Sequence, residues 1–178
     1  MSILTGTLGH ALLAVLAEGP RTGYALVRHL AQSIAFTWPA SHTQVYPELA
    51  KLRAAGLIRE GPAAPRGGRV YEVTDAGLKE VRRWLRETKP SRTVRSEAAL
   101  RLFFLWLLDP EEAAAYLRGE AEHARATLEA LERIAEQKDP DGPKTRAYRT
   151  ALELGLQTAR ARLAWAEDAL AAAGRRSP

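Results

Sequence analysis

The sequence predicts a mainly α-helical protein in two parts: residues 1–90, which include a β-hairpin, and an all-helical antiparallel domain over residues 91–178. Three observations predict it. Between Ser41 and Gly77 the pattern is that of a helix, a strand, a loop and a returning strand. After Asp109, two long runs place apolar residues at alternating spacings of four and three, which is typical of packed helices. Residues 1–90 carry a net charge of +5, whereas residues 91–178 are neutral.

Two short helices are expected at the start of the chain. The first spans about residues 4–17 and ends at Gly19-Pro20, because glycine adopts the conformation that follows a helix and proline cannot continue one. Thr22 is a suitable N-cap for the second. Their apolar residues recur at helical spacing and are expected to face the core: Leu4, Leu8, Leu12, Val15 and Leu16, then Leu26, Val27 and Leu30.

A third helix is predicted from a capping box formed by Ser41 and Gln44. It ends at Gly56, and three apolar residues at helical spacing are expected to be buried: Val45, Leu49 and Leu52. Pro47 lies inside this helix, where it removes a backbone hydrogen bond. We therefore expect the helix to begin one or two residues later than the capping box suggests.

A β-hairpin with a long tip follows the third helix. Residues 57–60 and 70–74 are rich in strand-forming residues, and residues 61–69 are rich in glycine and proline. This order of helix, strand, loop and strand predicts a winged helix-turn-helix domain. Thr74 or Asp75 is expected to cap a fourth helix, whose apolar residues are Leu78, Val81, Trp84 and Leu85.

Three helices are expected in residues 91–178. Residues 96–108 predict a helix that is apolar nearly all round and is therefore expected to be buried on all sides. Asp109, Pro110 and Glu112 predict the start of the next helix as its N-cap, first residue and capping-box partner. The last two helices are expected to form an antiparallel hairpin, because one is rich in acidic residues and the other in basic residues. Their apolar seams are Leu117, Ala121, Ala124, Leu128, Leu131 and Ala135, then Leu152, Leu156, Ala159, Leu163, Ala166, Leu170 and Ala173.

One helical hairpin has little interior of its own, so the excess of apolar surface predicts a homodimer. The alternative is a compact bundle within one chain. The residues expected to support dimerisation are Leu100, Phe103, Phe104, Leu107, Leu117, Leu128, Leu152, Leu156, Leu163 and Leu170.

The third helix and the hairpin tip favour DNA as the partner of residues 1–90, whose excess positive charge suits a polyanion. In a helix-turn-helix, the first turn of the second helix reaches the base edges. Thr43 and Gln44 suit base contacts, and His42 faces outward beside them. Phosphate contacts are expected from Ser41, Tyr46 and Lys51, and groove or backbone contacts from Arg66 and Arg69.

Each of these residues also has a structural interpretation. Ser41 and Gln44 can serve only as helix caps, Tyr46 can be a core residue with its hydroxyl at the surface, and the arginine-bearing loop can be ordinary solvated surface. A capped helix followed by a strand and a basic loop favours the DNA-binding interpretation over these alternatives.

Three stretches resemble the PadR family of transcriptional regulators: Gly19-Pro20-x-Thr22-Gly23-Tyr24-x-Leu26, then residues 41–58 with Val45-Tyr46-Pro47 at their centre, and Arg69-x-Tyr71-x-Val73-Thr74-x-x-Gly77. Residues 95–111 and 163–167 resemble the helical C-terminal domain of PadR-like and virulence-activator-like proteins. The resemblance implies a homodimer that represses, or sometimes activates, transcription. It places Tyr24 near DNA, together with Ser41, Thr43, Gln44, Tyr46, Lys51 and the two arginines of the wing.

The resemblance also implies a small aromatic effector, for which Trp38, Trp106 and Trp165 are candidates; their alternative role is ordinary core packing. No cofactor or metal site is expected, because the chain has no cysteine and its four histidines are scattered. An enzyme is therefore not expected. The second hypothesis is a protein-interaction adaptor built on a winged helix and a coiled-coil hairpin. No signal peptide or membrane span is expected, and the predicted location is the cytoplasm.

Overall fold

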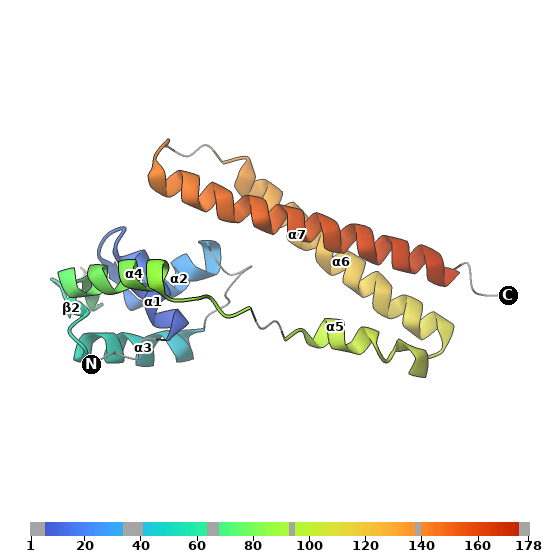
Figure 1. Cartoon of the computed structure of the whole chain (residues 1–178), viewed down its shortest axis with the longest axis horizontal. Helices are drawn as coiled ribbons and strands as arrows, with labels where there is room; N and C mark the ends of the chain where they lie inside the picture. Colours follow the sequence, from blue (N-terminus) through green and yellow to red (C-terminus); the bar gives the residue numbers. More distant parts are fainter. Residues whose placement is uncertain (1–5, 34–40, 64–67, 93–94, 138–139, 175–178) are drawn as a thin grey trace. The chain divides into compact units, whose positions relative to one another are not determined.

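The computed structural model describes residues 6–33, 41–63, 68–92, 95–137 and 140–174. The chain forms two compact units, Met1–Arg92 and Thr93–Pro178 (Figure 1). The predicted fold class is confirmed, since helices dominate both units and the first unit adds a small antiparallel sheet.

The first unit contains four helices and three short strands. In chain order these are α1 (Thr7–Leu16), β1 (Arg21–Thr22), α2 (Gly23–Ser33), α3 (His42–Ala54), β2 (Ile58–Glu60), β3 (Val70–Val73) and α4 (Asp75–Glu87). The four predicted helices and the predicted hairpin are all present. Thr22 caps α2 as expected, its Oγ1 accepting a hydrogen bond from the backbone N–H of Ala25 at 3.1 Å. Residues 4 and 5 of the first predicted helix lie outside the described residues.

The sheet has the order β1-β3-β2, and both pairings are antiparallel. Glu60 lies opposite Tyr71 across the wing hairpin, while Arg21 lies opposite Tyr71 on the other side. Strand β1 is an addition to the sequence prediction, because a two-residue strand carries no readable periodicity. It joins the start of α2 to the base of the wing.

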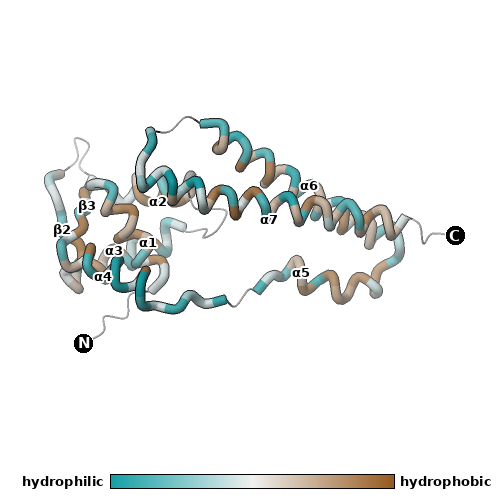
Figure 2. Tube along the Cα trace, turned by 45° about the horizontal axis from the view of Figure 1, so that its top comes forward, coloured by the Kyte–Doolittle hydropathy of each residue, from teal (hydrophilic) through white to brown (hydrophobic). Residues whose placement is uncertain are grey.

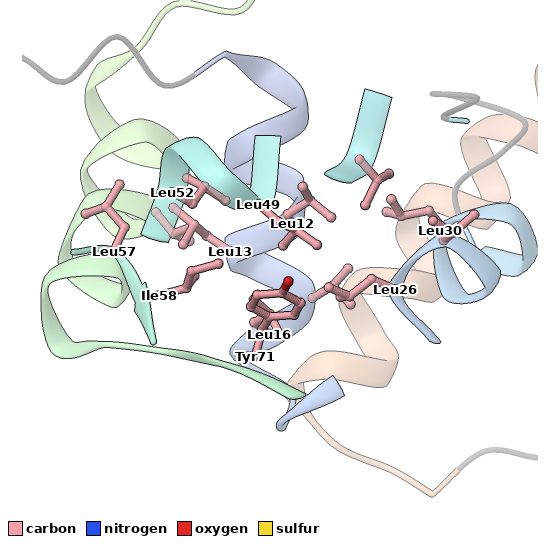
Figure 3. Close-up of a cluster of buried hydrophobic side chains, with 14 residues drawn as sticks. Leu12, Leu13, Leu16, Leu26, Leu30, Leu49, Leu52, Leu57, Ile58 and Tyr71 are labelled. Carbon is pink, nitrogen blue, oxygen red and sulfur yellow. The ribbon is translucent and has the colours of Figure 1, made fainter. Parts of the chain in front are cut away.

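One apolar cluster holds the first unit together (Figure 3). Leucines from α1, α2 and α3 meet the inner faces of β2 and β3, and burying each such side chain stabilises the fold by about 1.5–3 kcal/mol. The most deeply buried large side chains are Leu12, Leu13, Leu16, Leu26, Leu30, Val45, Leu49, Leu52 and Ile58.

Helix α3 begins at His42, so the expectation of a later start is wrong. Pro47 is the sixth residue of the helix and removes only the hydrogen bond that its N–H would have donated to the carbonyl of Thr43. The turn before that gap is held by the cap, in which Gln44 Oε1 accepts from the backbone N–H of Ser41 at 3.1 Å.

The other end of α3 is closed by Gly56, which adopts a left-handed conformation with φ +69°. The N–H of Leu57 reaches back to the carbonyl of Leu52 at 3.0 Å, and the N–H of Gly56 reaches that of Arg53 at 2.9 Å. These two bonds form a Schellman motif, which turns the chain directly into β2.

Helix α4 is fixed to α1 by a polar cluster. Nε2 of the buried His10 lies 3.0 Å from Glu80, and the His10 ring stacks on Trp84 with centroids 4.9 Å apart. Arg83 donates two hydrogen bonds to the same carboxylate, at 2.6 and 2.9 Å. The Arg83 hydrogen bonds, helped by His10, lower the pKa of Glu80 to about 2 although burial acts to raise it.

The second unit contains α5 (Glu97–Leu102), the 3-10 turn η1 (Leu105–Leu107), α6 (Pro110–Ala135) and α7 (Pro143–Gly174). The predicted capping box at the start of α6 is confirmed: Asp109 accepts from the N–H of Glu112 at 2.9 Å, and Glu112 accepts from the N–H of Asp109 at 3.2 Å. Helices α6 and α7 form the predicted antiparallel hairpin (Figure 1). Ion pairs that cross it join Arg125 to Glu167 at 2.8 Å and Arg160 to Glu132 at 3.4 Å.

The prediction of one buried helix over residues 96–108 is wrong for the single chain. Helix α5 stops at Leu102, and five of the apolar residues after it are exposed: Phe103, Phe104, Trp106, Leu107 and Leu108. Figure 2 shows that the segment after α5 is largely hydrophobic. Phe103 is 75% and Trp106 76% exposed. The physical reason is that the apolar seams of α6 and α7 pack against each other. One hairpin therefore cannot also cover a segment that is apolar on every side.

Among the described residues, none of the helices combines the length and the apolar character that crossing a bilayer requires.

Replacing Glu80 with glutamine is expected to lower the free energy of unfolding near neutral pH by about 1–2 kcal/mol, because charge-assisted hydrogen bonds to Arg83 and His10 are lost. The folded pKa of Glu80 lies below its unfolded value of 4.5, so this stability is present above about pH 4.5 and disappears as the pH falls towards 2. Urea unfolding from pH 2 to 7 measures it.

The same titration on Glu87→Gln is the control, because Glu87 is an exposed carboxylate of the same helix. A difference between wild type and Glu80→Gln that is as large at pH 2 as at pH 7 would contradict the assignment.

Candidate DNA-binding surface

The first turn of α3 is exposed because the helix is anchored by the side chains that point the other way. Val45, Leu49 and Leu52 are almost completely buried against the core. Spacings of four and three residues place them on one face of a helix, so the opposite face must look outward. The exposed residues on and around that face include Ser41, His42, Thr43, Gln44 and Lys51.

Hydrogen bonds tie the first turn into one network. Gln44 Oε1 accepts from the backbone N–H and from the Oγ of Ser41, at 3.1 and 3.2 Å. The hydroxyl groups of Ser41 and Thr43 lie 2.8 Å apart. Gln44 is thus a helix cap in the protein without DNA. A bidentate contact between the Gln44 amide and adenine would require the Gln44 oxygen to leave the cap.

Three aromatic rings lie in a row beside this turn. The rings of Tyr24 and His42 have centroids 6.3 Å apart, and those of His42 and Tyr46 are separated by the same distance. Tyr24 is 63% exposed and Tyr46 is 46% exposed, so Tyr46 lies at the surface and is not part of the core. A Cβ on Gly23 would lie only 2.7 Å from Cε1 of Tyr46, so the ring of Tyr46 lies directly over the first residue of α2.

A pocket of about 530 Å³ opens between the start of α2, helix α3 and the base of the wing. Its walls bring together residues that are far apart in the sequence: Thr22, Gly23, Tyr24, Tyr46, Gly68, Arg69 and Tyr71. The guanidinium of Arg69 is exposed and lies 3.6 Å from Glu60, which also pairs with Arg53. Lys51 pairs with Glu48 at 3.2 Å. Arg66, the other wing arginine proposed for DNA contact, lies outside the described residues.

Known proteins resemble the chain over both of its units. The sequence model described as the transcriptional regulator PadR-like family matches residues 12–83, and the one described as virulence activator alpha C-term matches residues 94–173. The negative transcriptional regulator PadR of Bacillus subtilis (strain 168) is 30% identical over 131 residues, which are 70% of this chain and 71% of that protein. The chain belongs to the PadR-like family of transcriptional regulators.

Solved structures agree with this assignment. The crystal structure of Bacillus subtilis PadR in complex with operator DNA is similar with a TM-score of 0.81 and 27% identity, covering 94% of this chain and 99% of that one. The crystal structure of the same protein in complex with p-coumaric acid gives a TM-score of 0.75 and 26% identity, covering 97% and 99%. The chain is therefore a PadR-like DNA-binding transcriptional regulator.

The residues predicted to support dimerisation of this PadR-like chain fall into two groups. The leucines of α6 and α7 are buried or half-buried in the single chain: Leu117, Leu128, Leu152, Leu156, Leu163 and Leu170. The remaining four are exposed in or just after α5: Leu100, Phe103, Phe104 and Leu107.

The three tryptophans considered for an effector pocket have different surroundings. Trp165 of α7 borders a cavity of about 560 Å³ whose lining also includes Leu102, His123 and Arg162. Trp106 is an exposed residue of η1 and does not line this cavity. Trp38 lies outside the described residues.

Sequence reasoning missed Gly23 and Tyr71 as lining residues of the pocket between α2, α3 and the wing. Tyr71 belongs to the motif that carries the resemblance to PadR-like proteins, and it is two residues from Arg69, which directly precedes β3 and lines the same pocket. That spacing was a usable signal. The contribution of Gly23 depends on how α2 and α3 pack, and no local pattern contains that information.

Proposed function

We propose that this chain is a homodimeric PadR-like repressor that reads an operator with the first turn of α3 and holds the flanking backbone with α2 and the wing. The single observation that carries the proposal is the convergence of α2, α3 and the base of the wing on one exposed pocket beside the capped turn. Repression follows the relative, which is named a negative transcriptional regulator.

The division of labour follows from the chemistry of each side chain. Thr43 and Gln44 carry groups that can pair with base edges, so they are the residues to specify sequence. His42, Tyr24, Tyr46 and Arg69 lie around them, where contacts to phosphate and sugar fix the register without reading bases. Ser41, Lys51 and Arg66 complete the proposed DNA-binding set.

Dimerisation is proposed from the apolar residues that one chain leaves uncovered. Six large apolar side chains that are close in sequence are exposed on α5, on η1 and beside them: Leu100, Phe103, Phe104, Trp106, Leu107 and Leu108. A contiguous apolar surface of this kind marks an interface in a soluble protein. A second copy is the simplest partner, because a two-fold axis would cover both surfaces with one contact and would present two reading turns to two half-sites.

An aromatic carboxylic acid is the effector class that we infer for the cavity beside Trp165. Trp165 provides a flat aromatic wall and Leu102 an aliphatic one. Arg162 and His123 provide groups that can hold a carboxylate, and Glu120 lines the same cavity. A relative of this chain has been crystallised with p-coumaric acid, which has this chemistry.

The Gln44→Ala variant is expected to change sequence preference more than overall affinity, because Gln44 is proposed to read a base. Operator fragments can be obtained by footprinting the DNA upstream of the gene and then compared with random duplexes by fluorescence anisotropy. The dissociation constant for random DNA divided by that for the operator measures specificity. This ratio should fall by about tenfold, equivalent to about 1–2 kcal/mol. Equal weakening on both DNAs would mean that Gln44 acts only as a cap.

Wild-type protein is expected to scatter light as a dimer at micromolar concentration, and the double variant Phe103→Asp, Leu107→Asp as a monomer. The reason is that each new carboxylate would have to be buried in the proposed interface. Leu85→Asp is a matched control, since Leu85 is an exposed apolar residue of the other unit. A monomeric wild type would refute the dimer.

Titration with p-coumaric acid is expected to quench tryptophan fluorescence and to weaken operator binding in the wild type. Trp165→Phe should lose most of the quench, because Trp165 borders the cavity. Trp106→Phe is the control, because Trp106 is exposed outside that lining. Quenching that persists in Trp165→Phe would show that the acid binds elsewhere.

A further inference from the structure

One carboxylate at the base of the wing is shared by two arginines. Glu60 is the last residue of β2, Arg53 belongs to the last turn of α3, and Arg69 directly precedes β3. Arg53 donates a hydrogen bond to Oε1 of Glu60, and the guanidinium of Arg69 lies 3.6 Å from the same oxygen. The N–H of Gly61 donates to the Val70 carbonyl at 2.9 Å, which holds the ends of the two wing strands together at this point. Glu60 therefore connects the end of α3 with the wing residue that precedes β3.

The contacts of Glu60 contribute little to the stability of the fold. All three side chains of the cluster are exposed, with 41% of the Glu60 side chain accessible to solvent. An ion pair between exposed side chains stabilises a protein only slightly, because water and salt screen both charges. A carboxylate on a surface that meets a polyanion also repels phosphate groups. The position of Glu60 is therefore better explained by an effect on DNA binding than by an effect on folding.

A second ion pair of the same hairpin provides a comparison. Arg59 pairs with Glu72 at 2.8 Å, directly across the two strands. Arg59 and Glu60 are consecutive in β2, so their side chains point to opposite faces of the sheet. Neither Arg59 nor Glu72 belongs to the proposed DNA-binding set. Of these two carboxylates, Glu60 is the one that occupies a proposed DNA contact.

We propose that Glu60 competes with the DNA backbone for Arg69 and so lowers the affinity of the chain for duplex DNA of every sequence. The inference rests on the proposed function and deepens it by naming a residue that limits binding. In the free protein the Arg69 guanidinium lies beside Glu60, and on DNA it exchanges that carboxylate for a phosphate. The exchange yields less free energy than the binding of an unpaired arginine, and it leaves a carboxylate close to the phosphates.

Arg53 makes this exchange easier. Its hydrogen bond to Glu60 does not involve Arg69, so the carboxylate keeps a cationic partner after Arg69 has moved to DNA. The same contact reduces the negative charge that approaching phosphates meet. We therefore expect Arg53 to favour DNA binding indirectly, by acting through Glu60.

The test compares full-length wild type, Glu60→Gln and Glu72→Gln on a random-sequence duplex, by fluorescence anisotropy over a series of salt concentrations. Backbone contacts carry no sequence information, so no operator is required. Glu60→Gln is expected to bind about fivefold more tightly at low salt and to steepen the slope of log K against log salt by about one unit, because Arg69 no longer leaves a carboxylate. Glu72→Gln makes the same change of charge on the other face of the sheet, and its affinity should change by less than about twofold.

A double-mutant cycle with Arg69→Gln identifies the arginine through which Glu60 acts. In the Arg69→Gln background, Glu60→Gln should strengthen binding only slightly, because the carboxylate then has no wing arginine to hold. Arg53→Gln is expected to weaken binding about twofold when Glu60 is present and to have no effect in Glu60→Gln. A loss that persists in Glu60→Gln would make Arg53 a direct DNA contact and would contradict its indirect role. Melting curves establish that each variant is folded.

The outcomes separate this inference from the proposed function. A wild type that does not bind duplex DNA at low salt refutes the proposed function and the competition together. A wild type that binds, with folded Glu60→Gln no tighter than Glu72→Gln, refutes the competition and leaves the proposed function standing. Equal strengthening by Glu60→Gln with and without Arg69 also refutes the competition, because Glu60 would then act only through its general charge.

Discussion

The burial of Val45, Leu49 and Leu52 is the constraint on which the rest of the first unit depends. It fixes the rotation of α3 about its axis, and therefore decides that His42, Thr43 and Gln44 face outward. The Schellman motif at Gly56 then carries the chain from the buried end of α3 into β2, so the wing starts from a fixed position. The packing of three buried side chains thus sets the orientation of α3 and the starting point of the wing.

The second unit is governed by a different constraint, namely that two helices can bury only one seam. Helices α6 and α7 pack against each other through Leu131, Leu152 and Leu156, and ion pairs join the flanks of the two helices. Surface pairs of this kind contribute at most about 1 kcal/mol each, so the seam provides most of the hairpin's stability. Five large apolar residues described after α5 are exposed in the single chain: Phe103, Phe104, Trp106, Leu107 and Leu108. The proposed second copy would cover them and would also provide a second reading turn.

The sequence predicted the features that depend on neighbouring residues, namely where helices begin and which of their residues face the core. Capping residues located the starts of α2, α3, α4 and α6, and helical spacing identified buried residues of α2, α3 and α6. In α4 it succeeded for Val81 but not for Leu85, which is exposed. The failures have non-local causes. Burial of residues 96–108 was read from composition, yet burial depends on what lies opposite, and one chain supplies too little. Strand β1 exists because β3 lies beside it, and the pocket exists because Gly23, Tyr46 and Tyr71 meet only after α2, α3 and the sheet have packed. Pro47 is tolerated because a cap secures the turn that it weakens.

Anchoring and reading are coupled through single residues. The side chain of Gln44 holds the cap in the absence of DNA, so turning it towards a base costs part of the stability of the first turn of α3. The DNA backbone, held by α2 and the wing as proposed, would lie next to that turn through Tyr46, whose ring lies against Gly23. Much of the binding free energy would then come from backbone contacts, which are the same for every base sequence. Specificity would arise because the correct base offsets the loss of the Gln44 cap and a wrong base does not. The cap would then make Gln44 selective, since a wrong base leaves its side chain better bonded to Ser41.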